Sequence, residues 1–340
     1  MKHKTFFWFV FPSVLAMLLF IAFPIVSVVI QSLHVAHEQV IITVQNCGPF
    51  GCTDSTKIDT DATAALRAAE PLGRWAGLTT YFDRGHLATN EVAHAWATAT
   101  SLPDFLGRLI NLPFYKAMFF TLTFTAIVTP LTLIFGFAIA VAVNSAAKSL
   151  RGPLIFFTLL PMIVTPLVGS LILFWMVDAR GIVGTLLQWA AGDPDLSVKA
   201  STPLMWAMLM VYGVWHSAPF AFIVYYAGLQ TVNKETLEAA VVDGASRWER
   251  IRYVVLPHLL PLTTFIALIQ LMDNFRVFEP IVSFSAQAHA TSLSWAIYND
   301  LGGETQQLSS AAATSVLTIL CIALLLTPVL VRTWRDFARK

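Results

Sequence analysis

Long apolar runs separated by short polar connectors dominate this chain. A helix needs about 20 apolar residues to cross the hydrocarbon core of a bilayer. Six runs reach roughly that length, and we expect each to form one membrane-spanning helix; they cover residues 6–30, 117–143, 154–177, 204–230, 259–284 and 310–331. The pattern therefore predicts an all-α polytopic membrane protein with about six transmembrane helices.

The composition supports this class. The 340 residues are 56% hydrophobic and only 12% charged, whereas charged residues make up about a quarter of a typical soluble chain. The net charge is +1, and no block of Lys and Arg is long enough to follow a phosphate backbone, so we expect no nucleic-acid partner. The first run follows "MKHK" and is longer than the core of a signal peptide, so we interpret it as a retained span.

Basic residues in the short connectors set the expected orientation. If the N-terminus is inside, the short outer loops contain only Arg180 and Lys199. The inner segments then hold Lys2, Lys4, Lys148, Arg151, Lys234, Arg247, Arg250, Arg252, Arg332, Arg335, Arg339 and Lys340. We therefore predict that both termini are cytoplasmic. The expected division is a first helix (1–32), an insertion outside the cytoplasm (33–116), core spans (117–331) and a cytoplasmic tail (332–340).

The insertion contains two cysteines and a small histidine cluster. Cys47 and Cys52 lie close together in "NCGPFGC", where a disulfide and two unpaired surface thiols are both plausible. His34, His37 and Glu38 suggest a metal-dependent membrane enzyme, but "HVAHEQV" lacks the second His of H-E-x-x-H. We expect neither a metal site nor catalysis by this chain.

A charged stretch stands out between the fourth and fifth runs, at about residues 231–258. Asn233 can cap a short helix, and Asp243 with Gly244 can interrupt it. Ser246 and Glu249 have capping-box spacing for a second helix, which Pro257 is expected to end or bend. The pattern predicts a compact helix–turn–helix projection suited to a groove on another protein, or alternatively an amphipathic loop on the lipid headgroups.

This stretch resembles a known family. "EAAVVDGASRWERIRYVVLP" is similar, in register, to the EAA loop of binding-protein-dependent ABC importer permeases. "WAGLTTYF", "FRVFEP" and "TSLSWAIYNDL" resemble the carbohydrate and polyol branch, the maltose and glycerol-phosphate permease type. The segment at about 35–74 departs from that branch, because it is longer than the usual first outer loop.

The resemblance implies the type I permease fold in the bacterial inner membrane. It implies that the EAA helix docks into a separate dimeric ATPase; the matching residues here are Glu238, Ala239, Ala240, Asp243, Gly244 and Ala245. This sequence contains no G-x-x-x-x-G-K-[ST] motif, so ATP and Mg²⁺ are expected on the ATPase and no cofactor on this chain. The further expected partners are a second homologous permease, a periplasmic solute-binding protein and a carbohydrate or polyol.

Polar and aromatic residues in the fourth and fifth runs mark a candidate substrate path. They are Tyr212, Trp215, His216, Gln270, Asp273, Asn274, Arg276 and Glu279. Ionisable groups at membrane depth generally face a cavity or one another, although each residue could instead serve helix packing and Arg276 could form an ion pair with Glu279. Pro161, Pro166 and Gly169 could loosen the third run. A self-contained secondary transporter or channel remains the alternative function.

Overall fold

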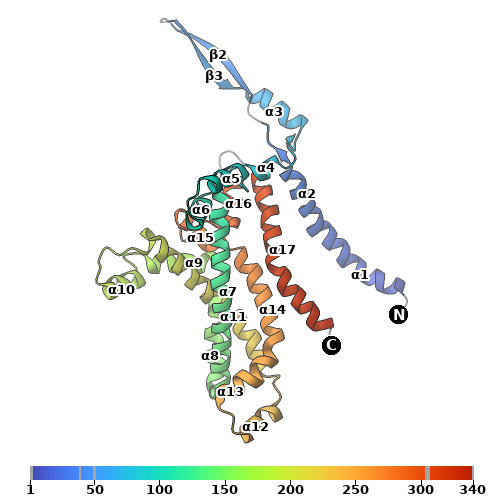
Figure 1. Cartoon of the computed structure of the whole chain (residues 1–340), viewed down its shortest axis with the longest axis vertical. Coiled ribbons are helices and arrows are strands. Elements are labelled where there is room, and N and C mark those ends of the chain that lie inside the picture. Colours follow the sequence, from blue (N-terminus) through green and yellow to red (C-terminus); the bar gives the residue numbers. More distant parts are fainter. Residues whose placement is uncertain (1–2, 38–39, 49–50, 303–306, 339–340) are drawn as a thin grey trace. The chain divides into compact units, whose positions relative to one another are not determined.

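The computed structural model describes residues 3–37, 40–48, 51–302 and 307–338, which are mostly helical (Figure 1). The chain divides into two compact units. The first unit comprises residues 1–115 and 296–319, and the second unit comprises 116–295 and 320–340. In the described part of the chain, five helices are long and apolar enough to cross a membrane, and one sharply bent helix pair could make a sixth. The prediction of about six spans is confirmed.

The first unit begins with an apolar span, Phe6–Ser32, that is continuous through a short π-helical segment. The segment after it contains two antiparallel strand pairs and four helices: β1 (His34–Val35) with β4 (Arg74–Trp75), β2 (Ile41–Gly48) with β3 (Gly51–Ile58), α3 (Thr60–Ala69), α4 (Thr79–Phe82), α5 (Thr89–Thr98) and α6 (Leu102–Ile110). Register places Cys47 opposite Cys52. Their side chains lie outside the described residues, so the choice between a disulfide and two thiols stays a prediction.

Hydrogen bonds tie this segment to the helix ends of the same unit. The hydroxyls of Ser32, the last residue of α2 (Phe23–Ser32), and Tyr81 are 2.6 Å apart. His86 is buried, and its Nε2 lies 3.1 Å from the carbonyl oxygen of Ser310 near the start of α17 (Leu308–Ala338). Such contacts stabilise a segment that is short for an independent core.

The second unit is a helical bundle. Its elements are α7 (Pro113–Ser145), α8 (Lys148–Ile163), α9 (Pro166–Val177), α10 (Ile182–Ala191), α11 (Thr202–Leu229), α12 (Lys234–Val242), α13 (Arg247–Arg250), a π-helical segment (Ile251–Val255), α14 (Leu256–Phe275), α15 (Glu279–Ser283) and α16 (Leu293–Gly302). Helices α7, α16 and α17 have residues in both units.

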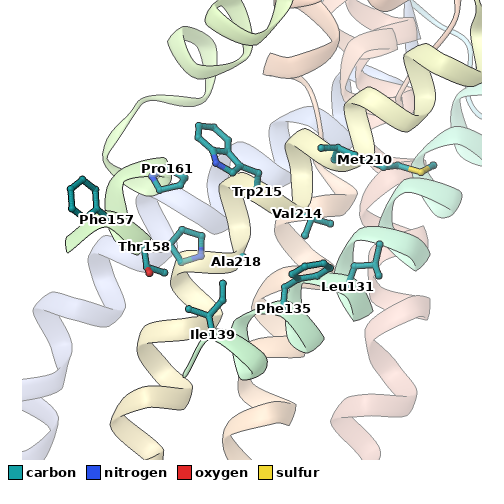
Figure 2. Close-up of a pocket in the computed structure, with 12 residues that line it drawn as sticks. Leu131, Phe135, Ile139, Phe157, Thr158, Pro161, Met210, Val214, Trp215 and Ala218 are labelled. Atoms are coloured by element: carbon teal, nitrogen blue, oxygen red, sulfur yellow. The ribbon is translucent and has the colours of Figure 1, made fainter. Parts of the chain in front are cut away.

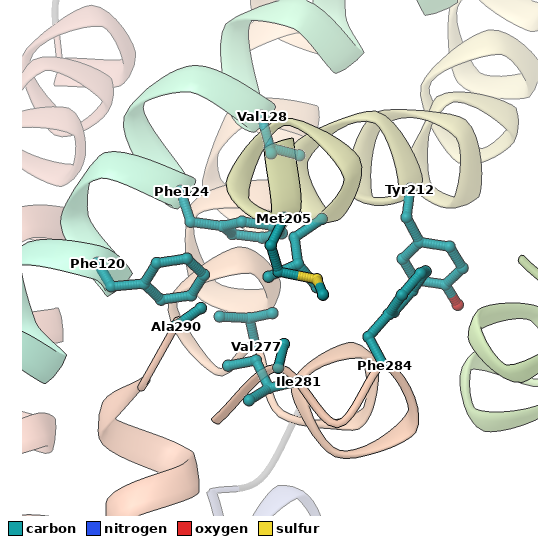
Figure 3. Packing of buried hydrophobic residues seen from close by; sticks show 11 residues of the cluster. Phe120, Phe124, Val128, Met205, Tyr212, Val277, Ile281, Phe284 and Ala290 are labelled. Atoms are coloured by element: carbon teal, nitrogen blue, oxygen red, sulfur yellow. The ribbon is translucent and has the colours of Figure 1, made fainter. Parts of the chain in front are cut away.

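Two apolar clusters hold this bundle together. The first cluster joins α7, α11 and the α14–α15 region (Figure 3); its members are Phe120, Phe124, Val128, Met205, Leu209, Tyr212, Val277, Ile281, Phe284, Ala286 and Ala290. The second cluster joins α7, α11 and the start of α14; its members are Ala140, Val143, Ala221, Phe222, Tyr225, Val255, Leu259 and Ile266. At Gly136 a Cβ atom would collide with Ala221, so the glycine allows α7 and α11 to approach closely.

The third predicted span is not one straight helix. Helix α8 ends at Ile163 and α9 begins at Pro166, with a bend of 95° between them. Val164 and Thr165 are extended, with ψ of 128° and 145°. A proline disfavours helical geometry in the residue before it, so Pro166 explains the conformation of Thr165. The expectation of an uninterrupted helix over 154–177 was wrong, and the loosening attributed to the prolines takes the form of a complete break.

The fifth predicted span also ends earlier than expected. Helix α14 stops at Phe275, and a non-helical link precedes α15, which begins at Glu279. At its other end, the helix passes Pro257 without a break, because the π-helical segment comes just before and Pro257 occupies the first turn of α14. The N–H of Leu256 bonds to the carbonyl of Ile251, an i→i+5 bond that widens the turn just before the proline and accommodates a residue without an N–H donor. The prediction that the span runs to residue 284 was therefore wrong, and Pro257 does not end its helix.

Candidate functional site

The charged stretch folds into the helix–turn–helix projection expected from its sequence. The side chain of Asn233 accepts a hydrogen bond of 2.9 Å from the N–H of Glu235, which caps α12. Gly244 has φ of +83°, and the N–H groups of Gly244 and Ala245 donate to the carbonyls of Val241 and Ala240. This pair of bonds is a Schellman motif, which ends a helix through a left-handed residue.

A capping box starts the second helix of the projection. The N–H of Ser246 donates to Glu249 Oε2 at 2.7 Å, and the N–H of Glu249 donates to Ser246 Oγ at 3.3 Å. Each bond satisfies a backbone donor that the first helical turn would leave free. The turn geometry is therefore fixed locally on both sides of Gly244.

Apolar side chains are exposed on this projection. Val242 is 87% exposed and Trp248 is 68% exposed, whereas Leu237 packs against the second cluster. Among the six residues matched to the EAA motif, Glu238, Ala239, Asp243 and Gly244 are exposed, and Ala240 and Ala245 are half-buried. A stably anchored turn that presents large apolar groups is suited to covering by another surface.

Two predicted path residues, Tyr212 and His216, form hydrogen bonds to the backbone on the two sides of the break between α8 and α9. Tyr212 Oη donates a hydrogen bond of 2.7 Å to the carbonyl oxygen of Pro166, the first residue of α9. His216 Nδ1 lies 3.1 Å from the carbonyl oxygen of Pro161, in the last turn of α8. A carbonyl only accepts, so Nδ1 carries the proton. One face of α11 therefore contacts both sides of the break.

Trp215 lies on the next face of α11 and lines a cavity of about 530 Å³ (Figure 2). Figure 2 shows Phe157 and Pro161 of α8 and Phe135 of α7 around it. Trp215 is 41% exposed, and the walls are almost entirely apolar. The cavity therefore offers a stacking surface with few polar partners.

Gln270 and Asn274 are buried inside the second unit. Asn274 Nδ2 donates a hydrogen bond of 3.0 Å to Thr129 Oγ1 of α7, and both residues are at least nine-tenths buried. Gln270 is 3% exposed, and its Oε1 has no hydrogen-bond partner among the described residues. The Asn274 contact is an interhelical hydrogen bond, which helps α7 and α14 to associate in a membrane.

The remaining path residues, Asp273, Arg276 and Glu279, are exposed at the link between α14 and α15. Arg276 pairs with Asp273 at 2.8 Å, so the alternative of an ion pair between Arg276 and Glu279 is not what the structure shows. Because α14 ends at Phe275, Arg276 and Glu279 do not share a continuous helix face. Glu279 is the first residue of α15, which packs against α9 and contacts α11.

Sequence reasoning missed two polar features of the second unit. One is a buried threonine stripe along α7, formed by Thr121, Thr125, Thr129 and Thr132. Its three- and four-residue spacing is readable in the sequence and places it on one helix face. The other is an ion pair of 2.6 Å between Lys199 and Asp178, with the Lys199 ammonium 3.3 Å from the centre of the Phe174 ring.

No group of three metal-ligating side chains occurs among the described residues. His34 Nδ1 lies 2.8 Å from the carbonyl oxygen of Ile30, and its ring packs edge-on against Trp75. Glu38, the third member of the suggested cluster, lies outside the described residues. His34 is thus engaged in local structure.

Comparison with known families decides the identity. The profile of the "binding-protein-dependent transport system inner membrane component" family matches residues 98–335, well over half of the chain. The chain belongs to this family. It is therefore a transport permease subunit and a multi-pass inner-membrane protein. The match does not extend over most of the insertion between α2 and α6.

The chain is also similar to named permeases. The chain is 29% identical to the sn-glycerol-3-phosphate transport system permease protein UgpA of Yersinia pestis, over 63% of this chain and 74% of that protein. It is 26% identical to the trehalose transport system permease protein SugA of Mycobacterium tuberculosis, over 76% of this chain and 80% of that protein. A solved bacterial ABC transporter that imports the acidic polysaccharide alginate has the same fold, with a TM-score of 0.60 and 20% identity over 82% of this chain and 97% of that one.

Proposed function

We propose that this permease moves a sugar, a sugar derivative or a polyol into the cell, using work done by a separate ATPase dimer. The observation that carries the proposal is the helix–turn–helix formed by α12, the Gly244 turn and α13, here named the coupling projection, on which Val242 and Trp248 are exposed. Similarity to permeases named for trehalose and glycerol phosphate supports the cargo class. ATP and Mg²⁺ belong to the ATPase, because the sequence has no P-loop motif.

The coupling projection faces the cytoplasm, and so do both chain ends. The distribution of Lys and Arg in the short connectors supports this orientation. A second, homologous permease completes the pore, and a periplasmic binding protein delivers the cargo. Membership of the binding-protein-dependent family supports both partners.

The exposed residues of the candidate path are the ones that contact the cargo. Trp215 is partly exposed beside a cavity, and Asp273, Arg276 and Glu279 are exposed. A sugar presents apolar C–H faces that stack on aromatic rings and hydroxyls that donate to carboxylates. The more buried members of the path support it by packing and hydrogen bonding between helices; they are Tyr212, His216, Gln270 and Asn274.

Uptake by reconstituted liposomes tests this function. The chain is assembled with the ATPase, second permease and binding protein that its neighbouring genes encode, and uptake of radiolabelled trehalose, maltose and glycerol 3-phosphate is measured. We expect uptake of at least one compound only when ATP and the binding protein are both present. Gradient-driven uptake by the purified chain alone would instead support the secondary transporter, and uptake of none of the three would refute the cargo class.

A further inference from the structure

Helix α6 of the first unit has an apolar face that is largely exposed in the described part of the chain. Leu102 is 67% exposed and Leu106 is 51% exposed, and they lie one turn apart. Phe105 and Leu109 are half-buried and extend the same face. Spacings of three and four residues place all four side chains on one side of the helix.

The opposite face of α6 is polar and fixed by hydrogen bonds. Arg108 Nε lies 3.0 Å from Asp104 Oδ1, and Arg108 Nη1 donates to Thr98 Oγ1 at 2.7 Å. The N–H of Thr100 donates to Asp104 Oδ2 at 3.1 Å. The bonds to Arg108 and Thr100 hold the pKa of the Asp104 carboxyl below its usual value, so it stays ionised. Ionised groups need water, which orients this face away from hydrocarbon.

The chain keeps α6 close to the first turn of the spanning helix α7. Helix α6 ends at Ile110, and the spanning helix α7 begins at Pro113. Two intervening residues can separate these ends by at most about 10 Å. Tyr115, in the first turn of α7, donates a hydrogen bond of 3.0 Å to the carbonyl oxygen of Leu87, just before α5. The start of α7 is thus joined to the α5 region as well as to α6.

Aromatic side chains gather where α5, α6 and the first turn of α7 meet. Trp96 and Phe105 pack edge to face with ring centres 5.1 Å apart, and Trp96 is 63% exposed. Together with Tyr115 they line a mainly apolar cavity of about 450 Å³. Trp and Tyr are enriched at membrane–water interfaces, where a ring can be apolar at one end and hydrated at the other.

We propose that α6 lies in the plane of the membrane interface, with Leu102, Phe105, Leu106 and Leu109 directed into the lipid at the surface where α7 enters the bilayer. Trp96 sits beside it at the headgroup level. Amphipathic helices with Leu, Phe and Trp on one face bury that face about 5–10 Å into the boundary between headgroups and acyl chains. This surface would thus act as an anchor that sets the height of the insertion above the bilayer, independently of the cargo.

Spin labels on adjacent residues test the orientation. Leu106→Cys and Gly107→Cys are labelled separately in a full-length chain that carries Cys47→Ser, Cys52→Ser and Cys321→Ser, assembled with its partner subunits in lipid nanodiscs. Gly107 is the matched control, because it lies on the polar face and a Cβ there meets nothing within 4 Å. Collision of each label with oxygen, which concentrates in lipid, is compared with collision with a water-soluble nickel chelate.

We expect the ratio of oxygen to nickel collisions to be severalfold higher for the Leu106 label than for the Gly107 label. Equal ratios with strong nickel collision at both sites would mean that the apolar face is in water, and the proposal would fail. Low collision rates with both reagents at Leu106 would mean that a protein covers the face, and this too would overturn it. None of these outcomes depends on transport, so a failure of the proposed function leaves the test intact.

Discussion

Tyr212 Oη donates a hydrogen bond of 2.7 Å to the carbonyl oxygen of Pro166, across the break between α8 and α9. A turn further along α11, His216 reaches the carbonyl oxygen of Pro161 on the other side of that break. Irregular backbone at membrane depth is tolerated only where its polar groups are satisfied by protein or water. The two side chains therefore tie α11 to both sides of the bend, and His216 supplies a donor to a carbonyl in the last turn of α8.

Removing the hydroxyl of Tyr212 should make the angle between α8 and α9 more variable while leaving the packing of its ring in the first cluster unchanged. The Tyr212→Phe variant keeps the ring that packs in the first cluster and loses one hydrogen bond, which contributes about 1 kcal/mol to the free energy of unfolding. We expect a lower thermal midpoint and a broader distance distribution between spin labels at Phe157 of α8 and Ile172 of α9. Double electron–electron resonance measures that distribution.

His216 provides the matched control for the same bend. In His216→Asn the amide nitrogen can replace the Nδ1 donor, whereas His216→Leu leaves the Pro161 carbonyl without it. The Asn variant should keep the narrow distance distribution, and the Leu variant should broaden it. Equal distributions in both variants would show that the hydrogen bond has no part in holding the bend.

The turn at Gly244 should tolerate only residues that accept positive φ. Gly244 has φ of +83°, a left-handed conformation that costs an ordinary L-residue roughly 1–2 kcal/mol. A β-branched residue is strained further there, so we expect a cost of about 2 kcal/mol or more. No atom lies within 4 Å of an added Cβ, so backbone strain alone is tested. We expect Gly244→Val to lose most binding-protein-stimulated ATPase activity of the assembled transporter.

The control at this position is Gly244→Asn, since Asn adopts the left-handed conformation most readily among residues with side chains. It should retain the larger part of the stimulated ATPase activity. If the Val variant matches the Asn variant, the geometry of the Schellman turn does not matter for coupling.

The exposed Trp248 should contribute to ATPase binding and little to folding. Trp248→Ser removes a side chain that is 68% exposed, so the free energy of unfolding should change by less than about 0.5 kcal/mol. Loss of a buried aromatic anchor at an interface commonly costs about 2 kcal/mol or more, which is over tenfold in Kd. Titration of the purified ATPase against the permease in nanodiscs measures this change.

Trp189→Ser is the comparison, because Trp189 is 81% exposed in the same unit but lies on α10, away from the coupling projection. It should leave ATPase affinity unchanged. A similar loss of affinity in both variants would assign the effect to general damage rather than to the projection.

The sequence left a disulfide and two free thiols open for Cys47 and Cys52, and we expect the disulfide if the insertion faces an oxidising compartment. The antiparallel register pairs these two positions directly across β2 and β3. Protein purified from membranes without reductant should weigh two hydrogen atoms less than the reduced chain, and Cys47→Ser should abolish that difference. An unchanged mass on reduction would show two free thiols.

The sequence predicted the elements whose signals are local. Runs of apolar residues placed the spans, and the Asn233, Gly244 and Ser246 signals placed both short helices of the projection, because caps act within a few residues. The Thr165–Pro166 step also carried a readable break signal, which the length of the apolar run outweighed. The contact between Asn274 and Thr129 could not be predicted, because it joins residues 145 positions apart whose faces meet only after the bundle packs.

The ion pair of Asp178 and Lys199 should make stability sensitive to acid. The hydrogen bond from Lys199 and the N–H of Arg180 lower the pKa of the Asp178 carboxyl from 3.8, its value in an unfolded chain. The folded state therefore binds the proton less readily than the unfolded chain. The ion pair contributes its full stabilisation at pH values above the pKa of Asp178 in the unfolded chain, and this contribution is lost as the pH falls through the lower pKa of the folded state.

The difference in thermal midpoint between the native protein and Asp178→Asn should be constant near neutral pH and shrink below about pH 4. Asp195→Asn, which removes an exposed carboxylate from the connector that carries Lys199, controls for the lost charge and should show a smaller difference at neutral pH. A gap for Asp178→Asn that persists unchanged in acid would mean that its ionisation does not stabilise this link between α9 and α11.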